Sequence, residues 1–214
     1  MALALLKRGD LAPVALEALS KNASVIQRRK VRLGVIAHPK TPRRVSLSIL
    51  RQLYTFDLMQ AALLPTVPAD VKKAAEETLV TRLDTIASGE RLALARRASA
   101  RIAGELLKDK EARVMQTALE NPRLTESAII KAILRRDASA ALVQAVCHHA
   151  RWSVSREVRI ALLRNDTTPL ARAIAFARSL PPTLIREVLQ NSRLPATTKT
   201  SLLRDAKQAR AAKS

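Results

Sequence analysis

Apolar residues recur along this chain at spacings of four and five, and the same pattern returns in five places. With an Asn or a His taken as position zero, the five copies are centred on His38, Asn121, His149, Asn165 and Asn191. Positions −7, −3 and −2 are apolar in every copy, and this spacing places them on one face of a helix. Position zero fits the end of that helix, where Asn tolerates the left-handed backbone conformation.

A second helix is expected directly after each of these turns. Proline is favoured at a helix start because its missing N–H costs nothing there, and Ser and Thr are favoured as caps. The residues at this place are Pro42, Thr125, Ser153, Pro169 and Pro195. Apolar residues follow at +9 and +12, which are Leu47 and Leu50 in the first copy. The pattern therefore predicts a unit of two helices joined by a tight turn.

The copies also repeat at long range. Residues Val31–Pro42 match Val158–Pro169, so that His38 corresponds to Asn165. The spacing from Asn121 to Asn165 falls within the period of about 40–47 residues that is typical of HEAT and armadillo units. Over about residues 21–206 the chain therefore resembles the HEAT/armadillo class of α-solenoids.

Four short segments carry a more specific resemblance, which is to a bacterial group of uncharacterised HEAT-like proteins. These segments are Asn121–Thr125, Arg135–Asp137, Trp152–Arg159 and Thr168–Arg172. The resemblance implies the fold and brings no established activity with it.

These patterns predict an all-α fold, a right-handed α-solenoid of about five HEAT-like helical pairs. Only four Gly and four aromatic residues occur, which favours helix over sheet. We expect a helical cap over residues 1–20, the repeats over 21–206 and a basic flexible tail over 207–214. In the second half, helices are expected near 111–119, 125–135, 138–148, 154–164, 168–179, 182–190 and 196–208. In the first half, one or two short helices are expected over 2–19, one helix over 70–87 and one over 91–107.

The charge is strongly basic, because 38 Lys and Arg face 18 Asp and Glu and leave a net charge of +20. Nine of the basic residues lie between residues 21 and 56, where no acid occurs. Such a field attracts polyanions, nucleic acid first and an acidic protein next. Scarce aromatic residues argue against base stacking on single strands, so we expect DNA ahead of RNA. The plainer alternative is a solvated surface that reflects a genome rich in Arg and Ala codons.

Two rows of basic side chains could carry phosphate contacts. Position +2 of the repeat is basic in four of the five copies and precedes a helix N-terminus, which favours anions. Stacked units would align these side chains along one edge, although they could equally cover the turns. A second row lies on the helices and faces either a concave groove or solvent. The predicted nucleic-acid-binding residues are Arg32, Lys40, Arg43, Arg44, Arg123, Arg151, Arg159, Arg172 and Arg193.

No catalytic, cofactor or metal motif is found. The sequence Cys147-His148-His149 places its side chains about 100° apart on a helix, so a structural role is expected rather than metal binding. Phosphate-binding loops and nucleophile elbows are absent from the sequence. The fold class and charge resemble the bacterial alkylpurine DNA glycosylases, whose chemistry uses several aromatic residues around an acid. Here Trp152 is the only Trp, and no catalytic residue is carried over.

Three functions therefore remain open. A non-enzymatic nucleic-acid-binding protein leads, followed by a scaffold for an acidic protein partner and then by a glycosylase-like repair enzyme. A groove lined by Arg32, Arg159 and Arg172 would favour nucleic acid, exposed apolar residues in a groove would favour a peptide, and an acid beside Trp152 in a deep pocket would favour the enzyme. No cofactor or membrane span is expected, and the oligomeric state is left open. The single cysteine suits a reducing compartment, so a cytoplasmic location is expected.

Overall fold

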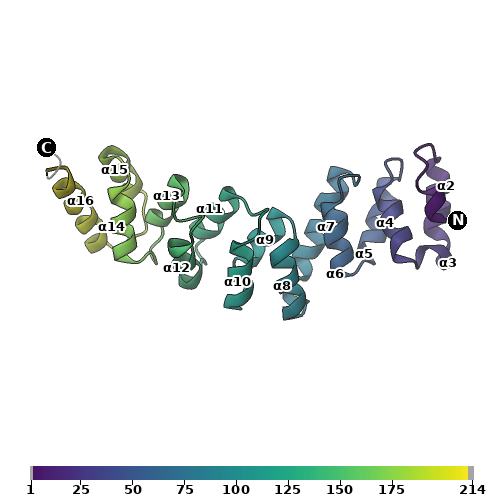
Figure 1. Ribbon diagram of the computed structural model, residues 1–214, viewed down its shortest axis with the longest axis horizontal. Helices are drawn as coiled ribbons and strands as arrows, with labels where there is room; N and C mark the ends of the chain where they lie inside the picture. Colours follow the sequence, from purple (N-terminus) through teal and green to yellow (C-terminus); the bar gives the residue numbers. More distant parts are fainter. Residues whose placement is uncertain (1, 212–214) are drawn as a thin grey trace. The chain divides into compact units, whose positions relative to one another are not determined.

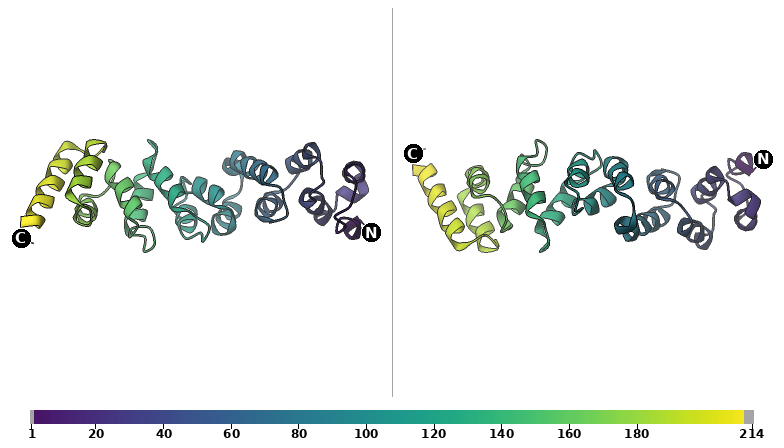
Figure 2. Two further views of the ribbon diagram at one scale, coloured as in Figure 1. Left: turned by 90° about the horizontal axis from the view of Figure 1, so that it is seen from above. Right: turned by 90° about the horizontal axis from the view of Figure 1, so that it is seen from below.

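The computed structural model describes residues 2–211, with side chains through residue 205. Every regular element in this part of the chain is helical, which confirms the all-α prediction: there are sixteen α-helices and one short 3-10 helix. The chain divides into two compact units, Met1–Ala103 and Gly104–Ser214, whose helices can be followed by colour in Figure 1 and Figure 2. The last residues of the expected tail, 212–214, lie outside the described residues.

Unit 1 is built from short helices joined by tight turns. They are α1 (Ala2–Leu5), α2 (Pro13–Lys21), α3 (Ala23–Ile26), α4 (Arg29–Ala37), α5 (Arg43–Arg51), α6 (Thr55–Leu63), α7 (Ala69–Arg82), the 3-10 helix η1 (Leu83–Thr85) and α8 (Ser88–Arg97). Helix α9 (Ala100–Leu106) carries the chain across the boundary between the units.

Unit 2 repeats the same construction, close to the expected bounds. Its helices are α10 (Ala112–Leu119), α11 (Glu126–Leu134), α12 (Ala140–His148), α13 (Arg156–Arg164), α14 (Leu170–Arg178), α15 (Pro182–Gln190) and α16 (Ala196–Ala211). Pro169 is the N-cap of α14 and Thr125 is the N-cap of α11, as expected. The N-cap of α13 is Ser155 rather than the predicted Ser153, because residues 150–154 form a longer turn.

Within each unit, a helix packs against the helix two places further along. In unit 1, α4 packs on α6 and α5 on α7, and in unit 2, α11 packs on α13, α13 on α15 and α14 on α16. The predicted apolar positions of the first helix lie in this core, as Val31, Val35 and Ile36 of α4 show. On the second helix the pattern is shifted, since Leu47 is half-buried and Ser46 is buried.

The length of one helical pair differs from the prediction. The segment between Asn121 and Asn165 contains three helices, α11, α12 and α13, in agreement with the predicted helix bounds, so its length is not the period of a two-helix unit. A step of two helices runs from Asn121 to His149, and another runs from Asn165 to Asn191. The interpretation of the Asn121–Asn165 spacing as one pair was therefore wrong. About five pairs was also too few, because many of these helices, such as α4 and α11, are short.

The helix expected over 91–107 is interrupted. Helix α8 ends at Arg97, Ala98 is extended with ψ of 176°, and α9 begins at Ala100. The sequence offers only Ser99 as a break, with no Gly or Pro beside it. Ala95 and Ala98 are both fully buried, so packing rather than local sequence ends the helix here.

In four of the five copies, the turn that follows the first helix is stabilised by the side chain at position zero of the repeat. This side chain accepts a hydrogen bond from the backbone N–H two residues later, which is an Asx-type turn. Asn and His interchange because both present an acceptor atom at the δ position. The pairs are His38 with Lys40 at 3.2 Å, Asn121 with Arg123 at 2.8 Å, His149 with Arg151 at 3.2 Å and Asn165 with Thr167 at 2.9 Å.

Two details of these turns correct the sequence interpretation. No described residue, glycine or other, has a positive φ, so Asn is not used for the left-handed conformation; Asn165 itself is extended, with φ of −92°. In the fifth copy the turn is shifted by one residue. There Ser192 accepts from Leu194 N–H at 3.1 Å, while the predicted Asn191 is exposed.

Candidate nucleic-acid interface

Arg32 binds the carbonyl ends of two neighbouring helices in unit 1. Its Nε donates to Ile26 O at 2.9 Å and its Nη2 to Gln27 O at 3.0 Å, both at the end of α3. Its Nη1 donates to Gln52 O at 3.3 Å, at the end of α5. Cations are favoured at helix C-termini, where unpaired carbonyls carry partial negative charge. The guanidinium therefore joins α4 to the helices on either side.

Arg159 makes the corresponding bonds in unit 2. Its Nε donates to Ser153 O at 2.7 Å, six residues earlier, and its Nη1 to Ser179 Oγ at 3.0 Å, twenty residues later. Arg32 reaches the same two sequence separations. Thr41 and Thr168 likewise donate to the carbonyl six residues before them. The correspondence between the two segments is thus found in hydrogen bonds as well as in sequence.

The other predicted arginines on helices also have partners within their units. Arg172 donates to Cys147 O and lies over the Phe176 ring, 4.8 Å from its centroid. Arg43 pairs with Asp70 at 3.0 Å. Arg44 pairs with Glu17, and this hydrogen bond lowers the pKa of the Glu17 carboxyl. Each of these arginines therefore has a partner inside its own unit, and the structure brings Arg159 and Arg172 together over the Phe176 ring.

Two of the predicted turn residues lie together in unit 2. Arg123 is in the turn between α10 and α11, and Arg151 is in the turn between α12 and α13. Arg151 Nη2 donates to Leu124 O at 3.3 Å, so the two turns touch. We call residues 120–125 and 149–155 together the first edge of unit 2. Both arginines are exposed there, beside the N-termini of α11 and α13.

Trp152 anchors the first edge. Its side chain is 3% exposed, and its Nε1 donates to Leu119 O at 2.9 Å, at the end of α10. The Arg151 guanidinium lies over the indole, 4.1 Å from the ring centroid, which is a cation–π contact. The tryptophan therefore holds the arginine in place and is not itself available to a ligand.

Arg193 lies elsewhere. Its N–H donates to Arg164 O at 3.0 Å and its Nη2 to Arg135 O at 3.3 Å, at the ends of α13 and α11. Helix α11 begins beside the first edge and spans about 13 Å at 1.5 Å per residue. The expected single row of Arg123, Arg151 and Arg193 is therefore wrong. Three helices separate the turn after α12 from the turn after α15, and an odd number of antiparallel helices returns the chain at the opposite side.

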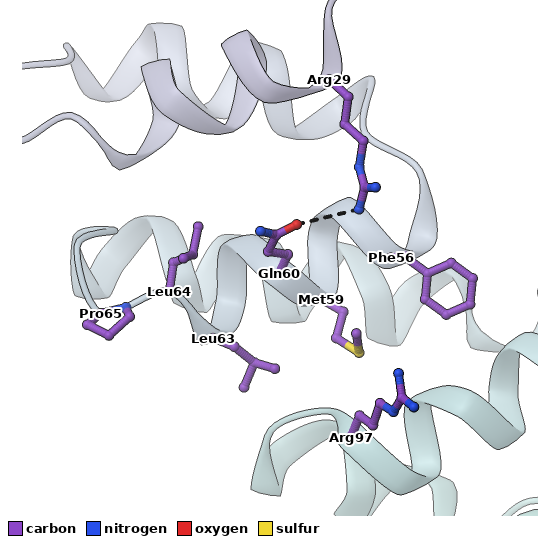
Figure 3. Close-up of a pocket in the computed structure, with 8 residues that line it drawn as sticks. All are labelled: Arg29, Phe56, Met59, Gln60, Leu63, Leu64, Pro65 and Arg97. Carbon is purple, nitrogen blue, oxygen red and sulfur yellow. Dashed lines mark hydrogen bonds between the residues drawn. The ribbon is translucent and has the colours of Figure 1, made fainter. Parts of the chain in front are cut away.

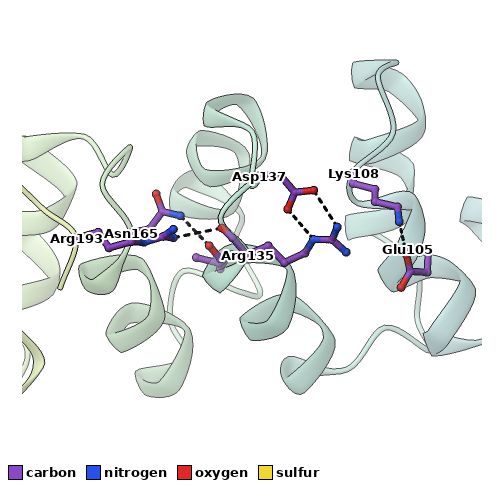
Figure 4. A network of polar contacts seen from close by, with 7 residues as sticks. Glu105, Lys108, Arg135, Asp137, Asn165 and Arg193 are labelled. Atoms are coloured by element: carbon purple, nitrogen blue, oxygen red, sulfur yellow. Dashed lines mark hydrogen bonds and ion pairs between the residues drawn. The ribbon is translucent and has the colours of Figure 1, made fainter. Parts of the chain in front are cut away.

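We call that opposite side the second edge of unit 2 (Figure 4). It includes Glu105, Lys108, Arg135, Asp137, Asn165 and Arg193. Here Arg135 makes two bonds of 2.9 Å to Asp137, and Lys108 pairs with Glu105 at 2.6 Å. The hydrogen bonds from Arg135 lower the pKa of Asp137 to about 2. Two cations of the second edge, Arg135 and Lys108, are therefore paired with carboxylates within the unit.

In unit 1, Lys40 occupies the turn between α4 and α5 and is exposed. Its backbone N–H is used by His38, whose other ring nitrogen lies 2.9 Å from Arg8 O. Asp10 is close enough for Lys40 to help lower the pKa of its carboxyl, behind the larger effect of Arg8. Lys40 therefore sits on a turn that is tied to the loop before α2.

The residues considered above for enzyme or metal chemistry are buried or have hydrogen-bond or ion-pair partners within the unit. His149 lies 3.1 Å from Glu120, whose side chain is 75% exposed, so no buried acid faces Trp152 there. Burial raises the pKa of the Cys147 thiol to about 11, and His148 bonds Gln144 O at 2.9 Å. Within residues 2–205, no group of three or more His, Cys, Asp or Glu side chains could hold a metal ion.

Sequence reasoning missed one surface, a groove in unit 1 (Figure 3). It is lined by apolar side chains of α6, among them Phe56, Met59 and Leu63, and is bounded by Arg29 and Arg97. A signal was present in the sequence, because Tyr54 and Phe56 are two of only four aromatic residues and lie in one turn of chain.

No known family model, no curated protein and no solved structure matches this chain. Among the described helices, none combines the length and the apolar character that crossing a membrane requires.

Proposed function

We propose that the chain is a non-enzymatic helical-repeat protein that binds nucleic acid through phosphate contacts, DNA ahead of RNA. The architecture we propose is a right-handed α-solenoid of HEAT-like pairs. The two-helix steps from Asn121 to His149 and from Asn165 to Asn191 are both shorter than the typical HEAT period. A cytoplasmic location, which the single buried cysteine suits, belongs to the same proposal.

The packing within each unit supports the solenoid. Many helices contact the one two places along, such as α5 with α7 and α11 with α13, and the same turn bonds recur along the chain. In a repeat array each unit buries its apolar face against its neighbours. The matching bonds of Arg32 and Arg159 are what such a repetition produces.

The charge supports a polyanionic partner. Unit 1 carries 18 Lys and Arg against 8 acids, and unit 2 carries 20 against 10, so each has a net charge of +10. The excess is therefore not confined to one end of the chain. A field of this kind draws in nucleic acid without regard to sequence.

The observation that carries the proposal is that Arg123 and Arg151 lie on two adjoining turns of the first edge of unit 2. Neighbouring helices pack about 8–10 Å apart. At about 3.4 Å per nucleotide along one strand, side chains in successive turns would meet phosphates about three nucleotides apart. Only one of the five N–H donors of Arg151 is used by Leu124 O, and stacking on Trp152 holds the guanidinium plane ready for a phosphate.

The test is binding to a labelled DNA duplex of about 25 base pairs across a salt series from about 50 to 200 mM. The Arg123→Ala/Arg151→Ala variant should reduce the slope of log K against log salt by about 2, since each phosphate contact contributes about 0.9. Arg193→Ala is the matched control, because it removes an exposed arginine from the opposite edge. If the double variant and the control bind alike, the first edge is not the phosphate-binding surface. Weak binding that vanishes by about 150 mM salt would reject nucleic acid as the partner.

A further inference from the structure

The groove of unit 1 consists of two adjoining pockets between α1, α4, α6 and α8. They have volumes of about 440 and 390 Å³ and share Arg29 and Gln60, so they form one continuous surface. The floor is apolar, with Leu33 of α4 and Phe56, Met59 and Leu63 of α6. No acidic residue is among the described residues that line either pocket.

Among the described residues, the exposed Tyr and Phe side chains lie at positions 54 and 56, and one of them, Phe56, lines this surface. Phe56 lines the groove and is 40% exposed, and Tyr54, two residues earlier, is 76% exposed. The other Phe and the only Trp, Phe176 and Trp152, are buried. Exposed aromatic residues beside apolar clefts are typical of the anchoring positions of protein interfaces.

The cations around the groove differ in what they already bind. Arg29 pairs with the buried carboxylate of Asp57, and its Nη2 donates to Gln60 at 3.4 Å (Figure 3). Arg28 and Lys30, its neighbours in sequence, also line the groove, and their side chains make no hydrogen bond or ion pair to another described residue. The groove thus offers uncompensated positive charge at the rim and apolar surface on the floor.

We propose that this groove docks an acidic segment of a partner protein that also carries apolar side chains. The apolar side chains would lie against Phe56, Met59 and Leu63, and the carboxylates would face Arg28 and Lys30. An amphipathic helix in a groove is a common way to satisfy both requirements. Charge decides against a second copy of this chain as the occupant, because both copies carry a net charge of +20. This site is independent of the nucleic-acid function proposed for the first edge of unit 2.

The probe is a fluorescein-labelled peptide of about 18 residues made of Leu, Glu and Ala, with Leu at helical spacings of three and four. A second peptide replaces every Leu by Ser and keeps the charge. Anisotropy with the full chain at about 150 mM salt should show the Leu peptide binding at least about tenfold more tightly than the Ser peptide. Equal binding of the two peptides would overturn the proposal, since the apolar floor would then play no part.

Two substitutions test whether the Leu peptide binds in the groove. Phe56→Ser and Lys30→Glu should each weaken binding of the Leu peptide at least about fivefold. Leu134→Ser and Lys131→Glu, exposed positions on α11 of unit 2, are the matched controls and should leave the affinity unchanged. Circular dichroism confirms folding, and Lys30→Glu, at an exposed position, still tests the site if Phe56→Ser does not fold. Equal effects at the control positions would overturn the assignment to this groove.

Other ligands give other outcomes. If Phe56→Ser weakens binding of a single-stranded oligonucleotide and leaves the peptide unaffected, the aromatic residues stack on bases and the proposal fails. If vesicles of anionic lipid bind in a Phe56-dependent way and the peptide does not, the surface is for a membrane and the proposal fails. The Arg123→Ala/Arg151→Ala variant should bind the peptide normally, and Phe56→Ser should bind duplex DNA normally. The two functions can therefore fail separately.

Discussion

The side chain of Asn165 joins the ends of two helices, α11 and α13, that are not consecutive in the chain. Its Nδ2 donates to Ile133 O in the last turn of α11 at 2.7 Å, and its Oδ1 accepts from the Thr167 N–H at 2.9 Å. The residue is 1% exposed. One buried amide thus ends α13, shapes the following turn and satisfies a carbonyl of the preceding pair.

Removing this amide should destabilise unit 2. In Asn165→Ala, the carbonyl of the buried Ile133 loses its partner at a cost of about 1–3 kcal/mol, and the loss of the bond to the N–H of the exposed Thr167 adds about 0.5–1.5 kcal/mol. We expect a loss of about 2–4 kcal/mol in the free energy of unfolding, measured by urea titration with circular dichroism. Asn165→His should lose less, because His occupies this position in the turns at His38 and His149. A loss below about 0.5 kcal/mol in Asn165→Ala would contradict this role.

Arg159 should matter for stability and not for nucleic-acid binding. Its Nε and Nη1 donate in two directions, to Ser153 O and Ser179 Oγ, and a lysine ammonium on a flexible stem cannot reproduce that fork. Both Arg159→Ala and Arg159→Lys should lower the unfolding free energy by about 1–2 kcal/mol. Duplex affinity should stay unchanged. The control is Arg186→Ala, an exposed arginine on α15. A folded Arg159→Ala variant with a reduced salt slope would instead assign this arginine to the phosphate surface.

Asp137 should titrate well below an ordinary aspartate. The hydrogen bonds from Arg135 lower its pKa from 3.8 to about 2 in the folded protein. Because the folded pKa is the lower one, the stabilisation is present above pH 3.8 and is lost as the pH falls through about 2. Carboxyl NMR titration should show the low pKa in the natural chain and a return towards 3.8 in Arg135→Ala. An unchanged pKa in that variant would mean that Arg135 is not the cause.

Cys147 should be unreactive while unit 2 is folded. The thiol is fully buried in α12, and burial raises its pKa from 9.0 to about 11. Since the folded pKa is the higher one, the thiol favours the folded state below pH 9.0, and this contribution is lost as the pH rises through about 11. At a pH of about 8, below the ordinary thiol pKa, a disulfide-exchange reagent should react at the rate of local opening and much faster in urea. Rapid labelling of the native protein would contradict the packing around α12.

The sequence predicted the helices of unit 2 well because their signals are local. Apolar spacing, Pro169 and Thr125 as N-caps, and an Asn or His at position zero all act within a few residues. The break at Ala98 was missed for the same reason, since burial against other helices ends α8 and no Gly or Pro marks it. The backbone conformation at Asn165 was also missed, because an Asn side chain can support a turn in more than one way.

The candidate site was predicted less well. The residue types and the match of Val31–Pro42 with Val158–Pro169 identified which arginines correspond, and the bonds of Arg32 and Arg159 follow the same correspondence. What each arginine binds is decided by carbonyls and carboxylates on other helices, far along the chain, as with Gln52 O and Ser179 Oγ. No local pattern contains that information.

By itself, the sequence determined an all-helical chain, the positions of most helices and turns, the internal repeat and a net charge of +20. The tertiary structure alone decided that α8 ends at Arg97 and that a new helix, α9, begins at Ala100. It also decided that Arg193 lies across α11 from Arg123 and Arg151, and that Phe56 faces an apolar groove between α4, α6 and α8. The physical reason is that helix periodicity is a property of neighbouring residues, whereas edges, grooves and the partners of an arginine depend on how many antiparallel helices lie between two turns.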